Sequence, residues 1–279
     1  MAGHIVVGVD GSAPATAAAE WAAADAQRRG LALRIVHVCQ QWPHSESTAY
    51  CASALDAAGG RARELTRDVR VTTELLSGDV ITGLIAESES ADSLVLGSRG
   101  LGGFAGMVLG SVGMAVAGHA AGPVVIVRTP SALRHDRVVV GYDGSEYSQA
   151  AMAYAVEQAR ARGAQLHVVS AWHMPALSPY AVAYGSLIED LMGEEARAAR
   201  ERVEPWRESH PDLVITDAQP CEPPVKALVE AAQMADVVVV GSRGLGGFAS
   251  AVLGSVSHGV LHHVTCPVAV VRPRAKEKS

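Results

Sequence analysis

The chain has 279 residues, of which 49% are hydrophobic and only 4% are aromatic. This length fits two domains of roughly 140 residues, each with a core of Val, Ile, Leu and Ala. The net charge of −6 argues against nucleic-acid binding, because a protein that binds a duplex needs a basic face to neutralise phosphates.

The first half alternates short apolar runs with helical segments. Strands are expected at residues 5–9, 33–38, 69–75, 93–96 and 124–127, and helices at 13–29, 81–88 and 111–119. Pro14 and Gly30 stand where the first helix is expected to begin and end. Continuous apolar strands that alternate with helices predict a parallel sheet covered on both faces.

The second half repeats this order. Residues 138–145 match the first strand and turn at an offset of 133, residues 166–170 match the second strand, and residues 237–240 match the fourth at an offset of 144. The 11 extra residues are expected around 174–189. The alternating acids and arginines of 194–208 are typical of a solvated helix face. These matches predict domains at 1–130 and 136–274, joined by a linker at 131–135.

A repeated segment carries the most specific signal. Residues 97–111 return as 241–255 with changes at only two positions, and no Asp or Glu occurs in 93–135 or 237–276. Glycines directly after a buried strand let the backbone approach a ligand. Ser111 is expected to be the N-cap of the next helix, whose amides attract an anion. With Arg99 and Arg243, these features predict a phosphate-binding loop rather than only a flexible turn.

Other readings of this segment fit less well. A Walker loop is excluded because neither copy ends in Gly-Lys-Ser/Thr. A dinucleotide fingerprint is expected after the first strand, with an acid about 20 residues on, and this segment follows the fourth strand instead. A membrane span at 101–127 is disfavoured by its seven glycines and by Gly122-Pro123 near its end.

At these residues the chain resembles the universal stress protein family, specifically its ATP-binding branch. The signature G-x2-G-x9-G-[S/T] is matched by Gly97, Gly100, Gly110 and Ser111, and again by Gly241, Gly244, Gly254 and Ser255. The turns at 9–12 and 142–145 and the endings at 119–127 and 263–271 also resemble family motifs. The resemblance covers nearly the whole chain. It implies an α/β fold of two tandem doubly wound domains, each a five-stranded parallel sheet of order 3-2-1-4-5 flanked by helices.

The resemblance also implies ATP, with Mg²⁺, at the carboxyl ends of strands 1 and 4, as the switch-point rule expects. The implied ligand-binding residues of the first half are Gly8, Val9, Asp10, Val38, Gly97, Arg99, Gly100, Gly110, Ser111 and Val112. Those of the second half are Gly141, Tyr142, Asp143, Ala171, Gly241, Arg243, Gly244, Gly254, Ser255, Val256 and Ser257. Asp10 and Asp143 would lie beside the ribose and phosphates, and Val38 and Ala171 would touch the adenine. An Asp before Gly-Ser is also a good turn former in its own right.

Each half departs from the family pattern. Where the family often has Gly-x-Pro, the chain has Gly78-Asp79-Val80 and Glu222-Pro223-Pro224. The Glu222 carboxylate is expected to narrow the second site or repel phosphate. After the signature serine, Gly113 stands where the second half has Ser257, so the first half is expected to lack a hydroxyl donor. Two sites of unequal affinity are therefore predicted.

The expected function is nucleotide-dependent sensing or regulation under stress, with an unidentified protein partner. Phosphoryl transfer needs a metal-holding carboxylate, a positioned nucleophile and cations on the γ-phosphate. Each site offers one Asp and one Arg, so no catalytic residue is expected, although slow ATP hydrolysis stays open. The alternatives are a slow ATP hydrolase or adenylyl/phosphoryl transferase, and a nucleotide-free protein-interaction scaffold.

Four further expectations concern assembly, metals, cysteines and location. The resemblance implies an internal pseudo-dimer through strands 124–127 and 268–271, and a homodimer is possible beyond it. His258 and His262 have metal-ligand spacing but no third ligand nearby, so no metal site is expected. The four cysteines show no paired spacing and are expected to be thiols in the cytoplasm. No signal peptide is expected either.

Overall fold

The computed structural model describes residues 3–39, 45–101, 109–128, 134–172, 185–246 and 252–274. Parts of three sequence predictions lie outside these ranges, and residues 174–184 belong to the segment expected to hold the extra residues of the second half. Residues 131–133 belong to the predicted linker, and residues 102–108 and 247–251 belong to the repeated segments.

The first half contains all the predicted elements and one more. Its elements are β1 (His4–Gly8), α1 (Ala13–Arg29), β2 (Ala32–Cys39), α2 (Ser45–Leu65), β3 (Val71–Ser77), α3 (Val80–Ser90), β4 (Ser93–Gly97), α4 (Ser111–His119) and β5 (Val124–Val127). The third strand begins two residues later than predicted. Helix α2 was not predicted, and its sequence includes the helix-weakening pair Gly59-Gly60.

The second half has the same order of elements. It contains β6 (Arg137–Gly141), α5 (Glu146–Arg162), β7 (Gln165–Val169), α6 (Gly185–Ser209), β8 (Ile215–Ala218), α7 (Pro224–Ala232), β9 (Val237–Gly241), α8 (Ser255–His263) and β10 (Val268–Val271). Leu33 pairs with Val71 in the first half and Leu166 pairs with Ile215 in the second. The offset therefore changes from 133 to 144 between β7 and β8, as predicted. The charged run lies on α6, whose charged side chains from Glu194 to Glu204 are exposed.

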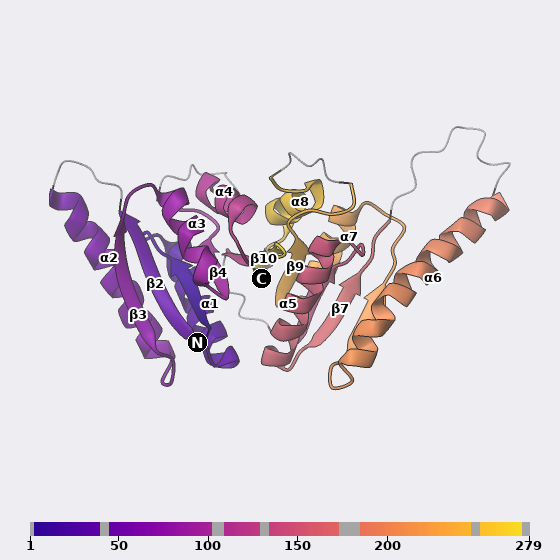
Figure 1. Cartoon of the computed structure of the whole chain (residues 1–279), viewed down its shortest axis with the longest axis horizontal. Helices are drawn as coiled ribbons and strands as arrows, with labels where there is room; N and C mark the ends of the chain where they lie inside the picture. Colours follow the sequence, from indigo (N-terminus) through magenta and orange to yellow (C-terminus); the bar gives the residue numbers. More distant parts are fainter. Residues whose placement is uncertain are drawn as a thin grey trace, which may run out of the picture.

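One ten-stranded sheet runs through both halves in the order β3-β2-β1-β4-β5-β10-β9-β6-β7-β8 (Figure 1). Strands are parallel within each half, and the strand order of each half confirms the predicted order 3-2-1-4-5. The halves meet where β5 pairs antiparallel with β10, with Ala269 opposite Val125. The predicted pseudo-dimer contact is therefore present.

Helices cover both faces of this sheet. Helices α1, α2, α5 and α6 pack on one face, and α3, α4, α7 and α8 pack on the other. Buried alanines line the inner side of α1 and allow close packing against the strands. The hydroxyls of Ser12 and Ser145 accept hydrogen bonds from the amides of Ala15 and Ser148 and cap α1 and α5. Gly30 and Gly163 end these helices in the left-handed conformation.

A buried polar network joins α1 to α5 across the middle of the molecule. The Asp25 carboxylate is fully buried. It accepts hydrogen bonds from Arg162 at 3.1 Å and from Gln158 at 3.0 Å. The Arg162 guanidinium lies over the Trp21 ring, and the Arg29 guanidinium lies over the Tyr154 ring. Each half therefore contributes an arginine that stacks on an aromatic ring of the other.

The prediction that all four cysteines are thiols was wrong. Cys39 at the end of β2 and Cys51 in α2 form a disulfide, with a Cα–Cα distance of 6.2 Å. These residues are 12 apart in sequence, and only the packing of the unpredicted α2 on β2 brings them together. Cys221 and Cys266 are thiols. Among the described helices, none combines the length and apolar character that crossing a membrane requires.

Candidate functional site

An aspartate follows the first strand of each half by two residues and connects two loops. One Asp10 carboxylate oxygen accepts the Ser12 amide at 3.0 Å, and the other accepts the Leu101 amide at 2.9 Å. Gly11, between Asp10 and Ser12, has a φ of +85°, a conformation that favours glycine. Asp10 therefore links the turn after β1 to the loop after β4.

The second half repeats this arrangement. The Asp143 carboxylate accepts the amides of Ser145 and Leu245, each at 3.0 Å. Burial raises the pKa of this carboxyl, but hydrogen bonds from Ser145, Leu245 and Ser148 outweigh burial and hold the pKa below its usual value. Asp143 is therefore a carboxylate at neutral pH.

The first signature glycine of each half is a packing residue. A Cβ on Gly97 would lie 2.7 Å from the backbone carbon of Pro14, and one on Gly241 would lie 2.9 Å from that of Tyr147. These positions let β4 and β9 pass close to the first turns of α1 and α5. Gly100 and Gly244 lie beneath the aspartates instead, because a Cβ on Gly244 would lie 2.5 Å from an Asp143 carboxylate oxygen.

The glycine-serine pairs place two helix N-termini at the same edge of the sheet. The Gly110 amide donates to the Ser98 carbonyl and the Gly254 amide to the Ser242 carbonyl, both at 2.8 Å. The N-cap residues are Gly110 and Gly254, so the prediction of Ser111 as N-cap was wrong by one residue. No described side chain caps either helix. The first-turn amides and the exposed serine hydroxyls of this part of the chain can therefore face a ligand.

Several predicted residues would contribute only their backbone. The side chains of Val9 and Tyr142 are buried in the core, and their amides donate to Val36 and Val169. Gly8 and Gly141 pack against leucines of the facing helix. Val112 and Val256 are half-buried in the first turns of α4 and α8.

The predicted adenine contacts lie at the ends of β2 and β7. Val38 is buried against Gly83 of α3, and Ala171 is half-buried. All the predicted site residues therefore lie along the edge formed by the carboxyl ends of the parallel strands, where doubly wound sheets bind ligands.

The two halves hold their cations differently. Arg99 is exposed, whereas the Arg243 guanidinium lies 4.7 Å from the centre of the Tyr147 ring. Pro14 occupies the position of Tyr147 in the first half. A stacked arginine is more restrained than an exposed one.

Sequence reasoning missed one residue in each site. The Tyr50 hydroxyl donates to the Asp10 carbonyl at 3.2 Å, and the Arg202 guanidinium donates to the Asp143 carbonyl at 3.2 Å. Tyr50 belongs to the unpredicted α2, and Arg202 is one of several similar arginines on α6. No local pattern in the sequence distinguished either of them.

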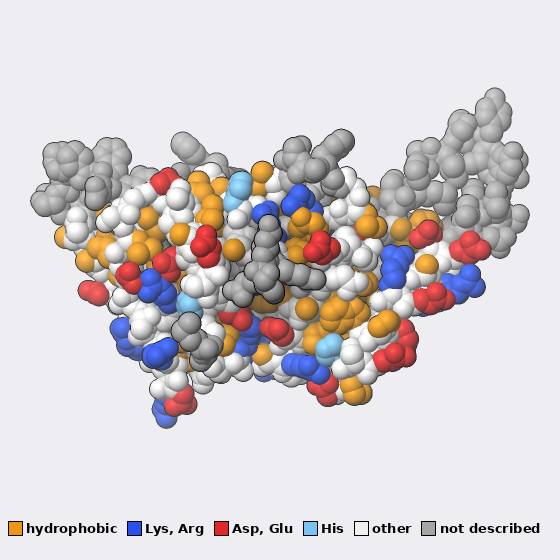
Figure 2. Space-filling view, viewed as in Figure 1, with side chains coloured by type: hydrophobic (Ala, Val, Ile, Leu, Met, Phe, Trp, Pro, Cys, Tyr) orange, Lys and Arg blue, Asp and Glu red, His pale blue; other side chains and the backbone are white. Residues whose placement is uncertain are grey.

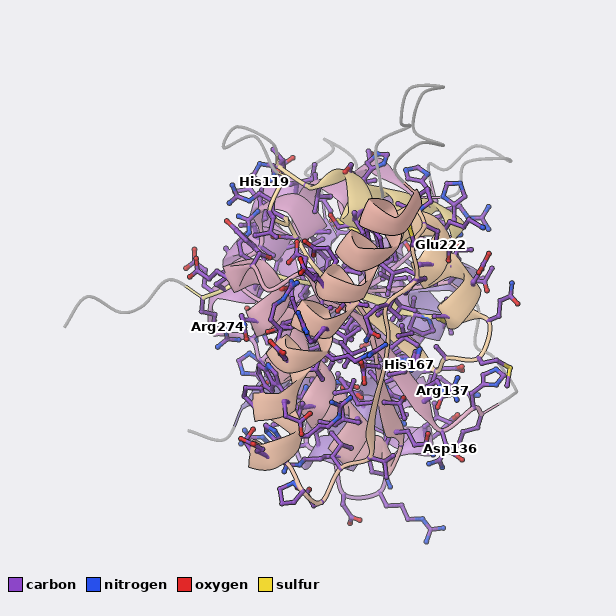
Figure 3. All side chains as sticks on the ribbon, turned by 90° about the vertical axis from the view of Figure 1, so that its right-hand side faces the viewer. His119, Asp136, Arg137, His167, Glu222 and Arg274 are labelled. Carbon is purple, nitrogen blue, oxygen red and sulfur yellow. A yellow bond between two sulfur atoms is a disulfide. The ribbon has the colours of Figure 1, made fainter. Side chains whose placement is uncertain are left out.

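The predicted departures have structural counterparts. The Ser257 hydroxyl is buried and donates to the carbonyls of Ser242 and Gly254, so it braces the loop rather than facing a ligand. Gly113 leaves the first half without this brace. Glu222 lies at the same end of the molecule as His119 (Figure 3) and pairs with Lys226 at 2.8 Å. This ion pair offsets part of the negative charge that was expected to repel phosphate.

The histidine pair on α8 has no third metal ligand beside it in the part of the chain that the structure describes. The rings of His258 and His262 lie 4.5 Å apart. Within the described ranges, no group of three His, Cys, Asp or Glu residues is placed to hold a metal ion. On the face shown in Figure 2, basic side chains are interspersed with acidic ones.

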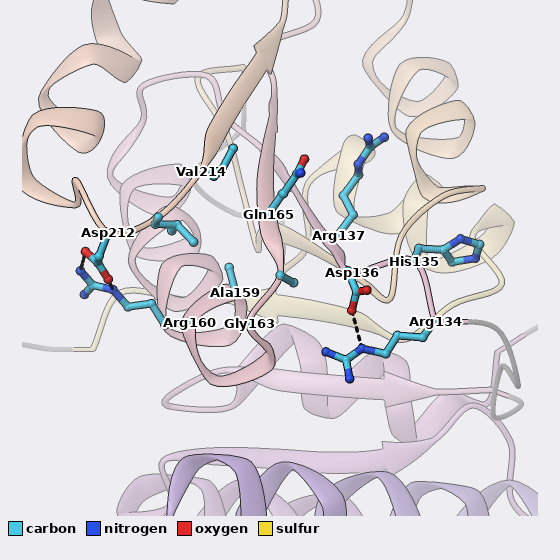
Figure 4. Close-up of a pocket in the computed structure, with 12 residues that line it drawn as sticks. Arg134, His135, Asp136, Arg137, Ala159, Arg160, Gly163, Gln165, Asp212 and Val214 are labelled. Atoms are coloured by element: carbon cyan, nitrogen blue, oxygen red, sulfur yellow. Dashed lines mark hydrogen bonds and ion pairs between the residues drawn. The ribbon is translucent and has the colours of Figure 1, made fainter.

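A cavity of about 740 Å³ opens at the other end of the second half (Figure 4). It is lined at the amino ends of β6 and β7 by Arg137 and Gln165. Two ion pairs, Arg160 with Asp212 and Arg134 with Asp136, neutralise charges in its wall. Parallel sheets bind ligands at the opposite edge, so this cavity is not assigned to the site.

Comparisons with known proteins agree with this architecture. The profile of the Universal stress protein family matches residues 1–128 and 135–272. A universal stress protein of Mycobacterium tuberculosis is 36% identical over 299 residues, covering 96% of this chain and 94% of that protein. Another from that organism is 34% identical over 294 residues, covering 96% of each.

Solved structures show the same fold. The crystal structure of a universal stress protein from Archaeoglobus fulgidus superposes with a TM-score of 0.69 at 22% identity, covering 96% of this chain and 98% of that one. Together, the two profile matches, the relatives and the repeated fold show that this chain belongs to the universal stress protein family, with one family domain in each half.

Proposed function

We propose that each half binds ATP with Mg²⁺ at the carboxyl ends of its first and fourth strands. The observation that carries this proposal is the meeting of a carboxylate, a glycine-lined loop and a helix N-terminus that no described side chain caps. This meeting occurs once beside Asp10 and once beside Asp143. Helix amides favour phosphate, and a carboxylate at a strand end favours ribose hydroxyls or a hydrated cation.

Different residues of each site would contact different parts of the nucleotide. The amides that begin α4 and α8, with the hydroxyls of Ser111 and Ser255, would hold phosphate oxygens. Asp10 and Asp143 would face the ribose or the magnesium ion. Val38 and Ala171 would contact the base, and Arg99 and Arg243 would offset phosphate charge.

The second site should bind the triphosphate more tightly. Arg243 is held by Tyr147, and Arg202 adds a second cation beside the Asp143 turn. In the first site, an exposed Arg99 and an uncharged Tyr50 take these places. Since electrostatic attraction is screened by salt, affinity of the second site should also fall more steeply as salt is added.

We infer that the nucleotide regulates partner binding rather than serving as the substrate of a fast reaction. In the described part of each site, one carboxylate at a strand end, Asp10 or Asp143, stands near a few arginines. That set is smaller than phosphoryl transfer uses. The enzyme alternative predicts steady turnover that is lost in Asp10→Asn and Asp143→Asn. The scaffold alternative predicts a folded protein without nucleotide affinity.

Calorimetric titration of the full chain with magnesium ATP tests the proposal. Wild type should bind two nucleotides per chain, whereas Asp10→Asn and Asp143→Asn should each lose or strongly weaken one. Asp212→Asn is the matched control, because Asp212 is an ion-paired carboxylate at the opposite end, and it should bind two. Absence of binding by folded wild type would refute the proposal.

A further inference from the structure

Only the first half has a disulfide beside its site. Cys39 directly follows Val38, the predicted base contact, and its partner Cys51 lies in α2. By the strand registers of the two halves, Trp172 stands where Cys39 stands in the first. The second half therefore cannot form the equivalent bond.

Helix α2 also contacts the Asp10 turn through the residue before Cys51. The Tyr50 hydroxyl donates to the Asp10 carbonyl at 3.2 Å. A Cβ on Gly11 would lie 2.5 Å from that hydroxyl and 3.2 Å from the Ala54 Cβ. The start of α2 is therefore packed directly on the turn that positions the Asp10 carboxylate.

Cys39 connects to a third segment of the same site. Its carbonyl accepts the Gly78 amide at 3.3 Å, just before α3 begins with Asp79 as its N-cap. The disulfide thus ties the end of β2 and the approach to α3 to the helix that holds the Asp10 turn. Cleavage of one bond would remove the covalent tie between α2 and β2 and leave only their packing, while the second site stays unchanged.

We propose that Cys39 and Cys51 form a thiol–disulfide site that sets the nucleotide affinity of the first half. This inference rests on the proposed nucleotide binding for one of its two readouts. The disulfide form holds Tyr50 and the Asp10 turn in the observed arrangement. The dithiol form loosens both and weakens the first site by about tenfold.

The chemistry is exchange with a small dithiol or a small disulfide. A reductant thiolate attacks one sulfur, the Cys39–Cys51 bond breaks, and the released thiolate takes a proton. The second reductant thiol then attacks the reductant's own sulfur in the mixed disulfide. The mixed bond breaks, the cysteine leaves as a thiolate that takes a proton, and the reductant has lost two electrons and two protons to the pair. A small disulfide reverses the reaction.

Burial makes this exchange depend on the start of α2. The relative exposures of Cys39 and Cys51 are 9% and 6%, whereas Tyr50 is 48% exposed. Opening of α2 around the exposed residues 48–50 is therefore the expected route to the sulfurs. Linkage requires nucleotide to favour the disulfide by the same factor by which the disulfide favours nucleotide. A tenfold effect corresponds to about 30 mV in the reduction potential of the pair.

The test compares the full chain before and after treatment with dithiothreitol. Counting reactive thiols under denaturing conditions should give two before and four after. Titration with magnesium ATP should show one site weakened about tenfold by reduction and the other unchanged. Cys51→Ser should have the weakened first-site affinity of the reduced protein, and dithiothreitol should not change that affinity. Cys221→Ser, which lacks only an exposed thiol, should lose first-site affinity on reduction as wild type does.

A second readout does not depend on nucleotide. Hydrogen exchange at the amides of Gly11 and Ser12 should speed up on reduction, and Tyr50→Phe should speed it up without reduction. If neither oxidation state binds ATP, the proposed function fails, and exchange alone decides this inference. The inference would be overturned if each site had the same ATP affinity before and after reduction, or if hydrogen exchange at the Asp10 turn did not change on reduction.

Discussion

Gly97 and Gly241 lie where β4 and β9 pass closest to the first turns of α1 and α5. An added methyl group would meet backbone atoms of Pro14 or Tyr147 within 3 Å, and backbone cannot move aside as a flexible side chain can. We expect Gly97→Ala and Gly241→Ala each to lower the free energy of unfolding by about 1–3 kcal/mol, measured by urea denaturation.

Gly60→Ala is the control for this expectation. Gly60 lies in α2 with no neighbouring heavy atom within 4 Å of a built Cβ, so alanine should leave stability unchanged or raise it by up to about 1 kcal/mol. A Gly97→Ala protein as stable as wild type would contradict the packing role. If the role holds, substitution of this signature glycine reports on folding rather than on ligand binding.

His37 gives the fold a dependence on pH. Burial lowers the pKa of this imidazole below its usual 6.5, and the Asp10 carboxylate opposes only part of the shift. Below about pH 6.5 the unfolded chain therefore binds a proton at this imidazole more readily than the folded chain does. Stability should fall as the pH drops from 7.5 to 5.5, with a smaller fall in His37→Gln. Equal urea midpoints for wild type at the two pH values would contradict this expectation.

At the scale of elements, the α1–α5 contact depends on one buried charge. Asp25 is the buried counterion of Arg162, whose pKa burial lowers to about 10 while Asp25 raises it. Removing one partner of a buried ion pair typically costs about 3–5 kcal/mol. We expect Asp25→Asn to lose an amount of this order in chemical unfolding, and the exposed Asp68→Asn to lose almost nothing. A loss below 1 kcal/mol for Asp25→Asn would show that water or Gln158 compensates Arg162.

Elements could be predicted where sequence and packing give the same pattern. The apolar runs of β1, β4 and β5 are buried on both faces, so hydrophobicity alone located them. Helix α2 contains two adjacent glycines that weaken its helical pattern in the sequence. Its stability comes instead from packing on β2 and β3, which the local sequence does not show. The disulfide and the Tyr50 contact depend on α2, so neither could be predicted.

The sequence predicted at which edge of the sheet the candidate site lies, but not the contacts that single residues make there. Topology places the ends of the first and fourth strands together, which the repeated motif already implied. The roles of single residues depend on packing: Gly110 rather than Ser111 is the N-cap of α4, and the Ser257 hydroxyl is used inside the protein. The cation that accompanies Asp143 comes from α6, about 60 residues away in the chain, beyond the reach of a local motif.

At the scale of the whole molecule, the continuous sheet should make the two halves unfold together. The β5–β10 pairing buries both central strands, and the Asp25 network joins the helices above them. We expect one calorimetric transition whose van't Hoff and calorimetric enthalpies agree. Two resolved transitions in wild type would show that the halves are independent units.

We propose unequal nucleotide sites on one sheet, and the nucleotide content of the protein reports on both sites at once. The purified chain is saturated with magnesium ATP, separated rapidly from free ligand and denatured, and the released adenine nucleotide is quantified by chromatography. Under this proposal, wild type should release close to two per chain, with the first site emptying sooner on dilution. A folded chain that releases no nucleotide and takes up none on adding ATP would contradict it.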